Sequence, residues 1–248
     1  MRNASIDVAD LEEPSDVVRS SGSTSTLTTQ VYERLRDDIV SGALTPGQRL
    51  TSDLLKERYG LGMTPLREAL QRLSASKLVT AEDRRGFRVA PISPGHLAEV
   101  IDLREAIEVL LLQNSFKNAS VRWESRIVAA YHGLQRTADY KFNPGPYTVN
   151  WEDAHREFHF ALLSAARLPM LEEFHLALWD HSSRYRNLAY AGKLMSPDVF
   201  DGHQQLMDAA LARDGELACM LLRRHISLAM AHIKGSLFPD ELAANDSR

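Results

Sequence analysis

The sequence predicts a mainly α-helical protein: a small N-terminal unit of three helices and a β-hairpin, followed by an antiparallel α-helical bundle. Three observations lead to this fold class. Apolar residues recur at three- and four-residue spacing over most of the chain after residue 26. Strand-like runs are confined to two short segments that flank a glycine-bearing turn. Between the two helical regions, Pro91-Ile92-Ser93-Pro94 has the composition of a domain boundary.

Composition places the chain among globular proteins of about two domains. With 248 residues, 44% of them hydrophobic, it can bury two cores of ordinary size. A single cysteine, Cys219, excludes an internal disulfide and fits a reducing cytosol. No run of about 18 apolar residues occurs, and the first residues are acidic instead of forming a leader sequence. We therefore expect a cytoplasmic protein that does not enter a membrane.

The chain divides into four segments. Residues 1–26 mix acidic residues with a serine- and threonine-rich run, so we expect a disordered tail. Residues 27–93 form the first domain, residues 94–237 the helical bundle and residues 238–248 a C-terminal tail. The net charge is -4, yet residues 27–93 carry eleven Lys and Arg against eight Asp and Glu. Positive charge is thus concentrated in the first domain, as contact with phosphates requires.

The first domain begins with two helices. The first ends at Ser41-Gly42, Pro46-Gly47 makes a turn, and a second helix starts near Ser52. Gly60-Leu61-Gly62 is a tight turn before the third helix. The residues expected to face inward are Val31, Leu35, Ile39, Val40, Leu54, Leu55 and Tyr59. A helix, a short glycine-containing turn and a further helix form a helix-turn-helix.

The third helix opens at Thr64-Pro65, where threonine can cap the helix and proline tolerates the first turn. Its buried stripe consists of Leu66, Ala69, Leu70 and Leu73. Away from that stripe lie side chains that can donate to base edges and phosphates, namely Thr64, Arg67, Gln71 and Arg72. The alternative is an ordinary amphipathic helix with a solvated charged face.

A hairpin follows the third helix. Residues 78–81 and 87–90 read as two short strands, joined by a turn that contains Arg84, Arg85 and Gly86. Such a wing can reach phosphates or the minor groove, whereas the alternative is a surface hairpin with solvated arginines. The order of helix, helix-turn-helix and hairpin favours the wing.

Residues 27–93 resemble the winged helix-turn-helix of the GntR family of bacterial transcription factors. The resemblance is carried by Ile39-Val40-Ser41-Gly42, Pro46-Gly47-Gln48-Arg49-Leu50, the run from Thr64 to Leu70, and Arg85-Gly86-Phe87-Arg88-Val89. It implies that Thr64 and Arg67 lie in the major groove, with Arg84, Arg85 and Gly86 at the wing. It also implies a homodimer on a palindromic, double-stranded operator.

The chain departs from the GntR pattern at two places. Gly62-Met63 stands where the family usually has a Ser-Arg or Ser-Lys pair, so one basic side chain is missing there. Lys77 stands where the family commonly has glycine, and it can add a backbone contact.

The second half reads as helices throughout. The first contains residues 97–111, and further helices are expected at 121–139, 148–166, 169–190, 197–212 and 214–236, with a break at Asn143-Pro144-Gly145-Pro146. No alternating strand pattern competes with them. An antiparallel helical bundle follows.

Histidines are the informative residues of the bundle. His155 and His159 are four residues apart, on one helix face, and can turn toward one metal ion. His203 and His225 lie on later helices, with room for a reversal between them. Four imidazoles suit zinc, nickel or another divalent transition metal. Alternatively, each histidine is separately a surface or core residue, as we expect for His132, His175, His181 and His232.

Residues 94–237 resemble the FCD effector domain of the FadR subfamily, a bundle of six or seven helices. Phe158-His159, His203 and His225 match its metal ligands in type and order, and His155 stands where aspartate is most common. Arg104 and Glu108 match its Arg-x-x-x-Glu. The resemblance implies a metal beneath a ligand pocket, where a carboxylate effector completes the coordination sphere.

Arginines are the expected partners of that effector. Arg104, with Arg184 or Arg186, would pair with its negative charge; the alternative for Arg184-Tyr185-Arg186 is a solvated basic face. Trp151, His155, Phe158-His159 and Arg184-Tyr185-Arg186 resemble the subgroup that represses glutarate and 4-aminobutyrate catabolism. That resemblance favours a small dicarboxylate.

The sequence thus predicts a ligand-responsive transcription regulator, a repressor released by a small carboxylate. Two alternatives remain at this point. One is a helical metalloenzyme that uses the four histidines, with Glu157 or Asp153 as general base. The other is a constitutive DNA-binding dimer without an effector.

Overall fold

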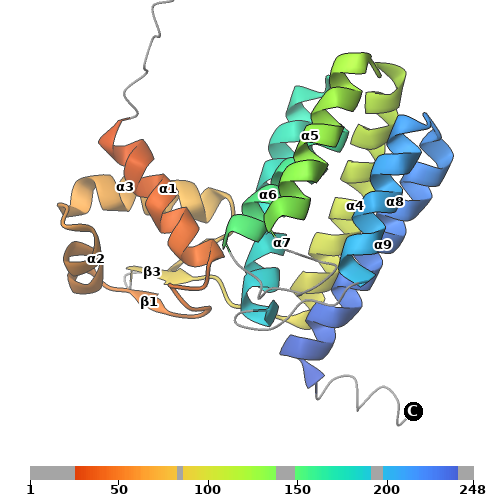
Figure 1. The fold of residues 1–248 in the computed structure, drawn as a ribbon. Coiled ribbons are helices and arrows are strands. Elements are labelled where there is room, and N and C mark those ends of the chain that lie inside the picture. Colours follow the sequence, from red (N-terminus) through yellow and green to blue (C-terminus); the bar gives the residue numbers. More distant parts are fainter. Residues whose placement is uncertain (1–25, 83–85, 138–148, 191–197, 240–248) are drawn as a thin grey trace, which may run out of the picture.

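The computed structural model describes residues 26–82, 86–137, 149–190 and 198–239. They form two bodies, a small N-terminal domain and a bundle of long helices beside it (Figure 1). Several predictions lie outside the described residues: the tail before residue 26, Arg84 and Arg85, the break at residues 143–146, and the C-terminal tail from residue 240.

The N-terminal domain is a winged helix-turn-helix. Its elements are α1 (Leu27–Val40), β1 (Arg49–Leu50), α2 (Ser52–Tyr59), α3 (Met63–Ala75), β2 (Val79–Glu82) and β3 (Gly86–Val89). The strands form an antiparallel sheet in the order β1-β3-β2, with Leu50 opposite Phe87 and Val79 opposite Val89. Strand β1 was not predicted, because two residues are too few to show an alternating pattern.

The helix ends follow from local chemistry. The Thr26 and Thr51 hydroxyls accept from the backbone N–H groups of Thr29 and Leu54, both at 3.3 Å, and so cap α1 and α2. Gly60 ends α2 in the left-handed region, at φ 66°. The prediction that Thr64 caps α3 is wrong: Gly62 holds the N-cap position without a side-chain hydrogen bond. The helix starts earlier because proline is tolerated throughout the first turn, whose N–H groups have no intrahelical acceptor.

The bundle consists of six helices within the described residues: α4 (Pro94–Lys117), α5 (Val121–Thr137), α6 (Val149–Leu163), α7 (Pro169–Tyr190), α8 (Asp198–Leu211) and α9 (Gly215–Leu237). The mainly helical fold class is therefore confirmed. Helix α4 runs further than the predicted residues 97–111. Its buried face continues to Leu112 and Ser115, and the Ser93 hydroxyl caps its start by accepting from the His96 N–H at 3.1 Å.

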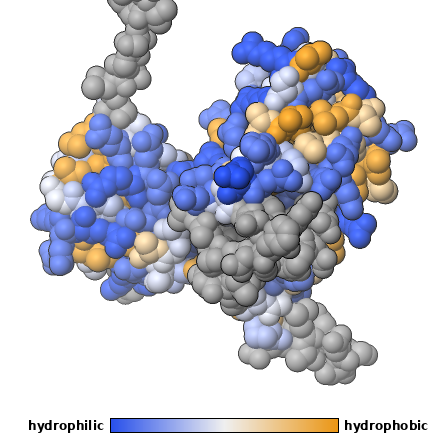
Figure 2. Space-filling model, viewed as in Figure 1, coloured by the Kyte–Doolittle hydropathy of each residue, from blue (hydrophilic) through white to orange (hydrophobic). Residues whose placement is uncertain are grey.

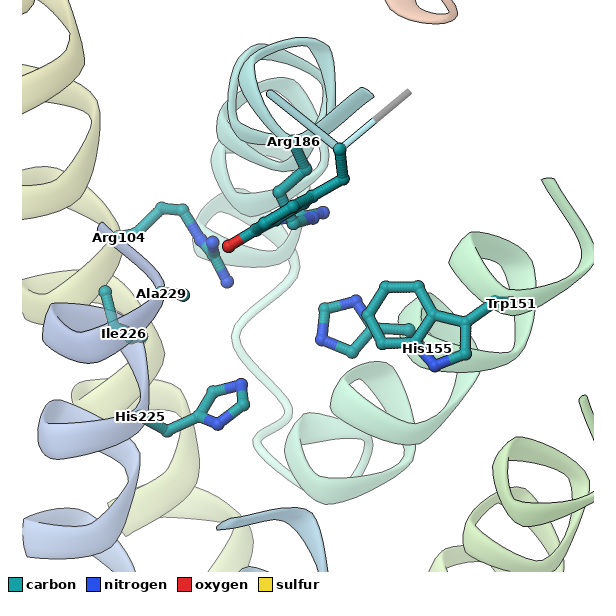
Figure 3. A pocket seen from close by; sticks show the side chains of 8 residues that line it. Arg104, Trp151, His155, Arg186, His225, Ile226 and Ala229 are labelled. Carbon is teal, nitrogen blue, oxygen red and sulfur yellow. The ribbon is translucent and has the colours of Figure 1, made fainter. Parts of the chain in front are cut away.

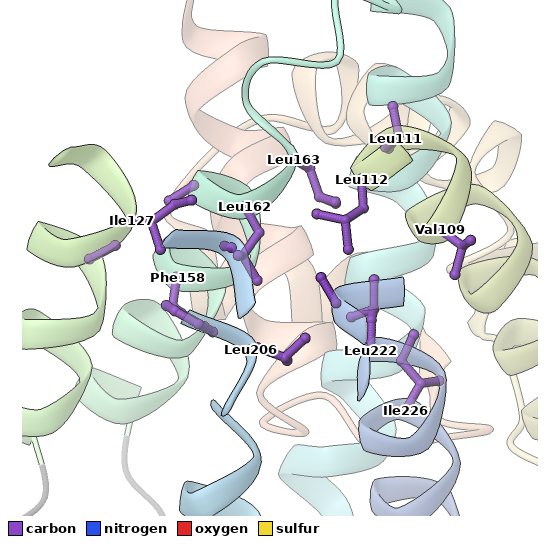
Figure 4. Packing of buried hydrophobic residues seen from close by; sticks show 14 of the residues in the cluster. Val109, Leu111, Leu112, Ile127, Phe158, Leu162, Leu163, Leu206, Leu222 and Ile226 are labelled. Atoms are coloured by element: carbon purple, nitrogen blue, oxygen red, sulfur yellow. The ribbon is translucent and has the colours of Figure 1, made fainter. Parts of the chain in front are cut away.

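Each body has its own hydrophobic core. In the first, α1 and α3 meet through Leu35, Leu66 and Leu70, which are fully buried. In the bundle, Phe158, Leu162, Leu206 and Leu222 converge from three helices (Figure 4). Burial of these side chains drives the packing of α6, α8 and α9 around a common core. Among the described helices, none has the length and apolar character needed to cross a membrane.

Helix α7 joins the two bodies. On the side of the N-terminal domain, the Arg36 guanidinium of α1 pairs with the Asp180 carboxylate. The Asn187 amide donates to the carbonyl of Val40 at 2.8 Å, and the His181 ring lies 2.8 Å from the carbonyl of Ser76 through its Nε2. The opposite side of α7 faces the interior of the bundle.

Candidate functional site

The outer face of α3 is a candidate DNA-contacting surface. Thr64, Arg67 and Gln71 are exposed, opposite the buried leucines. Within the described residues, Arg67 and Gln71 make no side-chain hydrogen bond, so their donors are available to another molecule. The Arg72 side chain is exposed as well, but its guanidinium lies over the Tyr32 ring of α1, 4.0 Å from its centroid.

Two positions around α3 explain departures from the family pattern. Met63 is half-buried and packs against the core of the N-terminal domain. Lys77 is exposed and has a φ of 62°, in the left-handed region where glycine is favoured. Gly86 also needs this region, at φ 90°, where β3 begins. The predicted contacts of Lys77 and Gly86 with DNA stay predictions.

The bundle brings the four predicted histidines together. One ligand nitrogen from each of His155, His159, His203 and His225 lies within 4.8 Å of all the others. Helix α6 contributes two imidazoles, α8 one and α9 one; the rings of His203 and His225 are 4.4 Å apart between centroids. His155 stacks on Trp151 with centroids 4.5 Å apart, which fixes its ring plane. Tertiary packing thus assembles a site from residues seventy positions apart.

The electrostatics of the cluster favour neutral imidazoles. Burial, then the neighbouring imidazoles, lower the pKa values of His155 and His159 well below the usual histidine range. Burial and then Arg104 lower the pKa of His225 to about 4. Neutral imidazole is the form that binds metals. The buried Nδ1 of His155 and Nε2 of His159 have no hydrogen-bond partner among the described residues, so the residues fit a divalent transition metal.

Gly202 is a site residue that sequence reasoning missed. A Cβ at this position would lie 3.2 Å from Nδ1 of His225, closer than ordinary contact. The absence of a side chain therefore lets the imidazole of α9 approach α8. The sequence signal was a glycine directly before His203 inside a predicted helix, where glycine has low helix propensity.

Beside the histidines lies a buried pair from α4, Arg104 and Glu108. Nε of Arg104 donates to Oε1 of Glu108 at 2.6 Å, and Nε2 of His175 is 3.2 Å from the same oxygen. Burial raises the pKa of Glu108, but Arg104 and then His175 outweigh that effect and bring the pKa down to about 2. Glu108 is therefore ionised and forms an ion pair with Arg104.

A second arginine–carboxylate pair joins α7 to α6. Arg186 donates from Nη2 to Oε1 of Glu152 at 2.5 Å and from Nε to Oε2 at 3.2 Å. The Ser182 hydroxyl accepts from both Arg104 and Arg186, at 2.6 and 2.7 Å. Both guanidinium groups also lie over the Trp179 ring, 4.9 and 4.7 Å from its centroid. These contacts hold the two arginines side by side above the histidines.

A small cavity separates the arginines from the histidines (Figure 3). Its volume is about 20 Å³, which is room for about one water molecule. The residues that line it are Arg104, Trp151, His155, Arg186, Tyr190, His225, Ile226 and Ala229. Arg104 and Arg186 point toward the side where His225 and His155 lie. Two imidazoles of the histidine cluster and two guanidinium groups thus line one cavity.

Arg184 does not line this cavity. Its guanidinium donates instead to the carbonyl of Ala90, at the junction with the N-terminal domain. Residues two apart in an α-helix point about 200° apart, so Arg184 and Arg186 must face opposite sides of α7. The alternative of a solvated basic face is wrong for both, because their exposed fractions are 1% and 4%. Burial lowers the pKa of Arg184 to about 10.

The remaining histidines lie outside the cluster. His132 and His232 are exposed. His175 is buried beside Glu108, and His181 is buried at the junction with the N-terminal domain.

Comparison with known proteins matches two segments of the chain to family models. Residues 27–89 match the model of the "Bacterial regulatory proteins, gntR family", and residues 99–228 match the FCD domain. The HTH-type transcriptional regulator BphR of Paraburkholderia xenovorans is 36% identical over 204 residues, which cover 82% of this chain and 83% of BphR. The HTH-type transcriptional repressor GlaR of Escherichia coli is 33% identical over 199 residues, covering 79% and 90%.

Solved structures show the same fold. McbR/YncC of E. coli superposes with a TM-score of 0.70 at 23% identity, covering 84% of this chain and 97% of that one. A putative GntR regulator from Rhodococcus sp. RHA1 gives a TM-score of 0.68 at 24% identity, with 84% and 98% covered.

Proposed function

We propose that this chain, which belongs to the GntR family of bacterial regulatory proteins and carries an FCD domain, is a repressor that a small dicarboxylate releases from its operator. Family membership makes it a DNA-binding transcription regulator, and not an enzyme. The observation that carries the proposal is a cluster of four histidines, two of which, His155 and His225, line a cavity together with Arg104 and Arg186. A cytoplasmic location belongs to the proposal, since the target is operator DNA.

The DNA contacts proposed are those of α3 and the wing. Thr64, Arg67 and Gln71 are exposed on one face and would meet base edges and phosphates in the major groove. Arg72 would contact a phosphate, because its guanidinium is held at the helix surface by Tyr32. The arginines of the turn before Gly86 would reach the adjacent backbone.

The metal proposed is zinc or nickel. FCD domains bind metals, and the cluster offers four neutral nitrogen donors, which borderline divalent ions accept. His155, His159, His203 and His225 would hold it. Such an ion supplies positive charge and open coordination positions for an anionic ligand.

Charge balance supports a doubly charged effector. Glu108 neutralises Arg104, and Glu152 neutralises Arg186. Four neutral imidazoles leave both charges of a divalent ion uncompensated. A dicarboxylate carries two negative charges that balance those of the ion, and its oxygens can accept hydrogen bonds from the guanidinium groups of Arg104 and Arg186.

The homodimer is proposed to form through α4 and α7. Along α4, the exposed residues Leu103, Ala106 and Leu110 follow the alternating three- and four-residue spacing of a helix–helix seam. Helix α7 packs beside α4 and exposes Met170 and Phe174. Two such helices per protomer can pair across a two-fold axis.

Apolar surface also gathers over α5 and α8, on the face seen in Figure 2. Because the dimer is proposed to form through α4, we expect Leu110→Glu to give monomers in sedimentation velocity. Val128→Glu, on the apolar surface of α5, is the matched control and should leave the dimer intact. The reverse result would move the interface to α5.

The proposed function is tested with purified protein and the DNA upstream of its own gene. We expect retardation in a gel-shift titration at low salt, and its reversal by millimolar glutarate when zinc is bound. No retardation at any protein concentration would refute the proposal that the protein binds an operator in this DNA. Retardation without reversal by any small carboxylate would favour a constitutive DNA-binding dimer.

A further inference from the structure

Glu152 lies between the N-terminal domain and the small cavity lined by Arg104, Arg186 and two histidines, here called the effector cavity. On one side, its carboxylate holds Arg186 through two hydrogen bonds and accepts a third from the Ser183 hydroxyl, at 2.5 Å. Nδ1 of His155 is 3.8 Å from its Oε2. The carboxylate is buried in this position, with 9% of the residue exposed.

On the other side, Glu152 lines a second cavity of about 240 Å³ between α1, α6 and α7. Two arginines, Arg36 and Arg156, line this interdomain cavity, together with three further carboxylates, Asp37, Asp153 and Asp180. Arg156 follows Glu152 by four residues on α6, the spacing at which glutamate and arginine pair. The Arg156 guanidinium now lies over the Phe160 ring, 5.1 Å from its centroid. Glu152 therefore has a second set of arginines on this side.

The same cavity contains the ion pair that fastens α1 to α7. Nε of Arg36 donates to Oδ2 of Asp180 at 2.5 Å, and Nη2 donates to Oδ1. Both side chains are mostly buried, with 19% and 10% exposed. Asp37 is close enough that Arg36 also donates to it, at 2.9 Å. Another carboxylate in this cavity would compete for Arg36 and repel Asp37.

An effector carboxylate that pairs with Arg186 through two N–H groups would compete with Glu152, which already accepts from Nε and Nη2. The cavity above the histidines holds about one water molecule, far less than a dicarboxylate needs. Nε, Nη1 and Nη2 of Arg186 all donate already, to Glu152, Ser182 and Ser183. A carboxylate that accepts from Nε and Nη2 of Arg186 therefore takes the place of Glu152 there.

We propose that Glu152 is the residue that couples the effector cavity to the DNA-binding domain, an inference that rests on the proposed function for its ligand. An effector carboxylate replaces Glu152 on Arg186. The released side chain turns into the interdomain cavity toward Arg156 and Arg36, competes with Asp180 and adds negative charge beside Asp37. The ion pair between Arg36 of α1 and Asp180 of α7 weakens, and the winged domain leaves the orientation that fits the operator. The two states differ in the partner of one carboxylate, as a two-state coupling requires.

Hydrogen exchange of the full-length protein tests the coupling without any ligand. Arg186→Gln removes the arginine that now pairs with Glu152 and should speed amide exchange in residues 27–40 by about tenfold, while residues 121–137 keep their protection. The double variant E152Q/R186Q has no carboxylate to release, and exchange in residues 27–40 should return close to that of the wild type. Unchanged exchange in R186Q, or equally fast exchange in the double variant, would overturn the proposal.

A second arm uses glutarate with zinc-loaded protein and does not depend on the folding of R186Q. In the wild type, glutarate should speed exchange in residues 27–40. Glu152→Gln should still bind glutarate in calorimetry but lose that response, whereas Glu173→Gln, an exposed control on α7, should keep it. A response in E152Q equal to that of the wild type would overturn the proposal. If the wild type binds no dicarboxylate, the proposed effector fails, and the ligand-free comparison still decides the role of Glu152.

Discussion

Replacing His155 by aspartate should separate metal binding from effector binding. The change adds one negative charge to a cluster of neutral imidazoles, so it should strengthen zinc binding while lowering the net charge that attracts a dicarboxylate. Ligand atoms of the cluster lie within 4.8 Å of one another. Two carboxylates at that distance repel by about 3.5 kcal/mol at an effective dielectric constant of about 20. This corresponds to about 300-fold weaker binding of a dianion that contacts the metal.

The assay is isothermal titration of glutarate into zinc-loaded protein, with zinc affinity measured separately by competition with a chromogenic chelator. His155→Asn is the matched control, because it has the size of aspartate without its charge, and its glutarate affinity should fall much less than that of His155→Asp. Equal glutarate affinity in the wild type and the aspartate variant, at equal zinc occupancy, would refute the charge argument. It would mean that the effector does not approach the metal.

Three further predictions concern α3, α8 and α4. Arg67→Ala should weaken operator binding in fluorescence anisotropy by about 5- to 150-fold, since such a contact is worth about 1–3 kcal/mol. The melting temperature should not change, because Arg67 is exposed. Unchanged affinity would mean that Arg67 does not contact the DNA. Gly202→Ala should weaken zinc binding in the chelator assay, because its Cβ would displace the His225 ring, whereas full zinc affinity would show that the ring can give way. The pKa of Glu108 is lowered from 4.5 to about 2, so its contribution to the free energy of unfolding is complete above pH 4.5 and is lost as the pH falls toward 2. In urea unfolding between pH 6 and pH 3, the free energy of unfolding of Glu108→Gln should therefore depend less on pH than that of the wild type. An equal pH dependence in both proteins would contradict the ionised state of Glu108.

Much of the fold could be predicted because its signals are local. The helices of the bundle begin and end near residues whose chemistry stops or caps a helix, and their apolar spacing is read directly from the chain. The two-residue strand β1 has no such signal, because its only role is to pair with β3. The start of α3 was misplaced because Thr64 is a favourable cap, while Gly62 takes that position through the preceding turn.

The candidate metal site was predictable in part. The spacing of His155 and His159 places both on one helix face, the reversal between the last two helices allows His203 and His225 to join them, and resemblance to a known domain supports the same four residues. Gly202 was missed, since its importance depends on how closely α9 passes α8. The sequence left open whether Arg184 or Arg186 faces the effector: helical geometry places them on opposite faces of α7, and only the packing of α7 decides that Arg186 faces the cavity.

By itself, the sequence determined which segments become helices, which side chains can bind a metal or DNA, and the family to which the chain belongs. Only the tertiary structure decided which charges neutralise one another: Glu152 with Arg186, Glu108 with Arg104, and Arg36 with Asp180. Two of these pairs join residues more than thirty positions apart. Local sequence patterns carry no information on such contacts, because they depend on how whole helices pack. The same packing makes α7 contact both the cavity beside the histidines and the N-terminal domain.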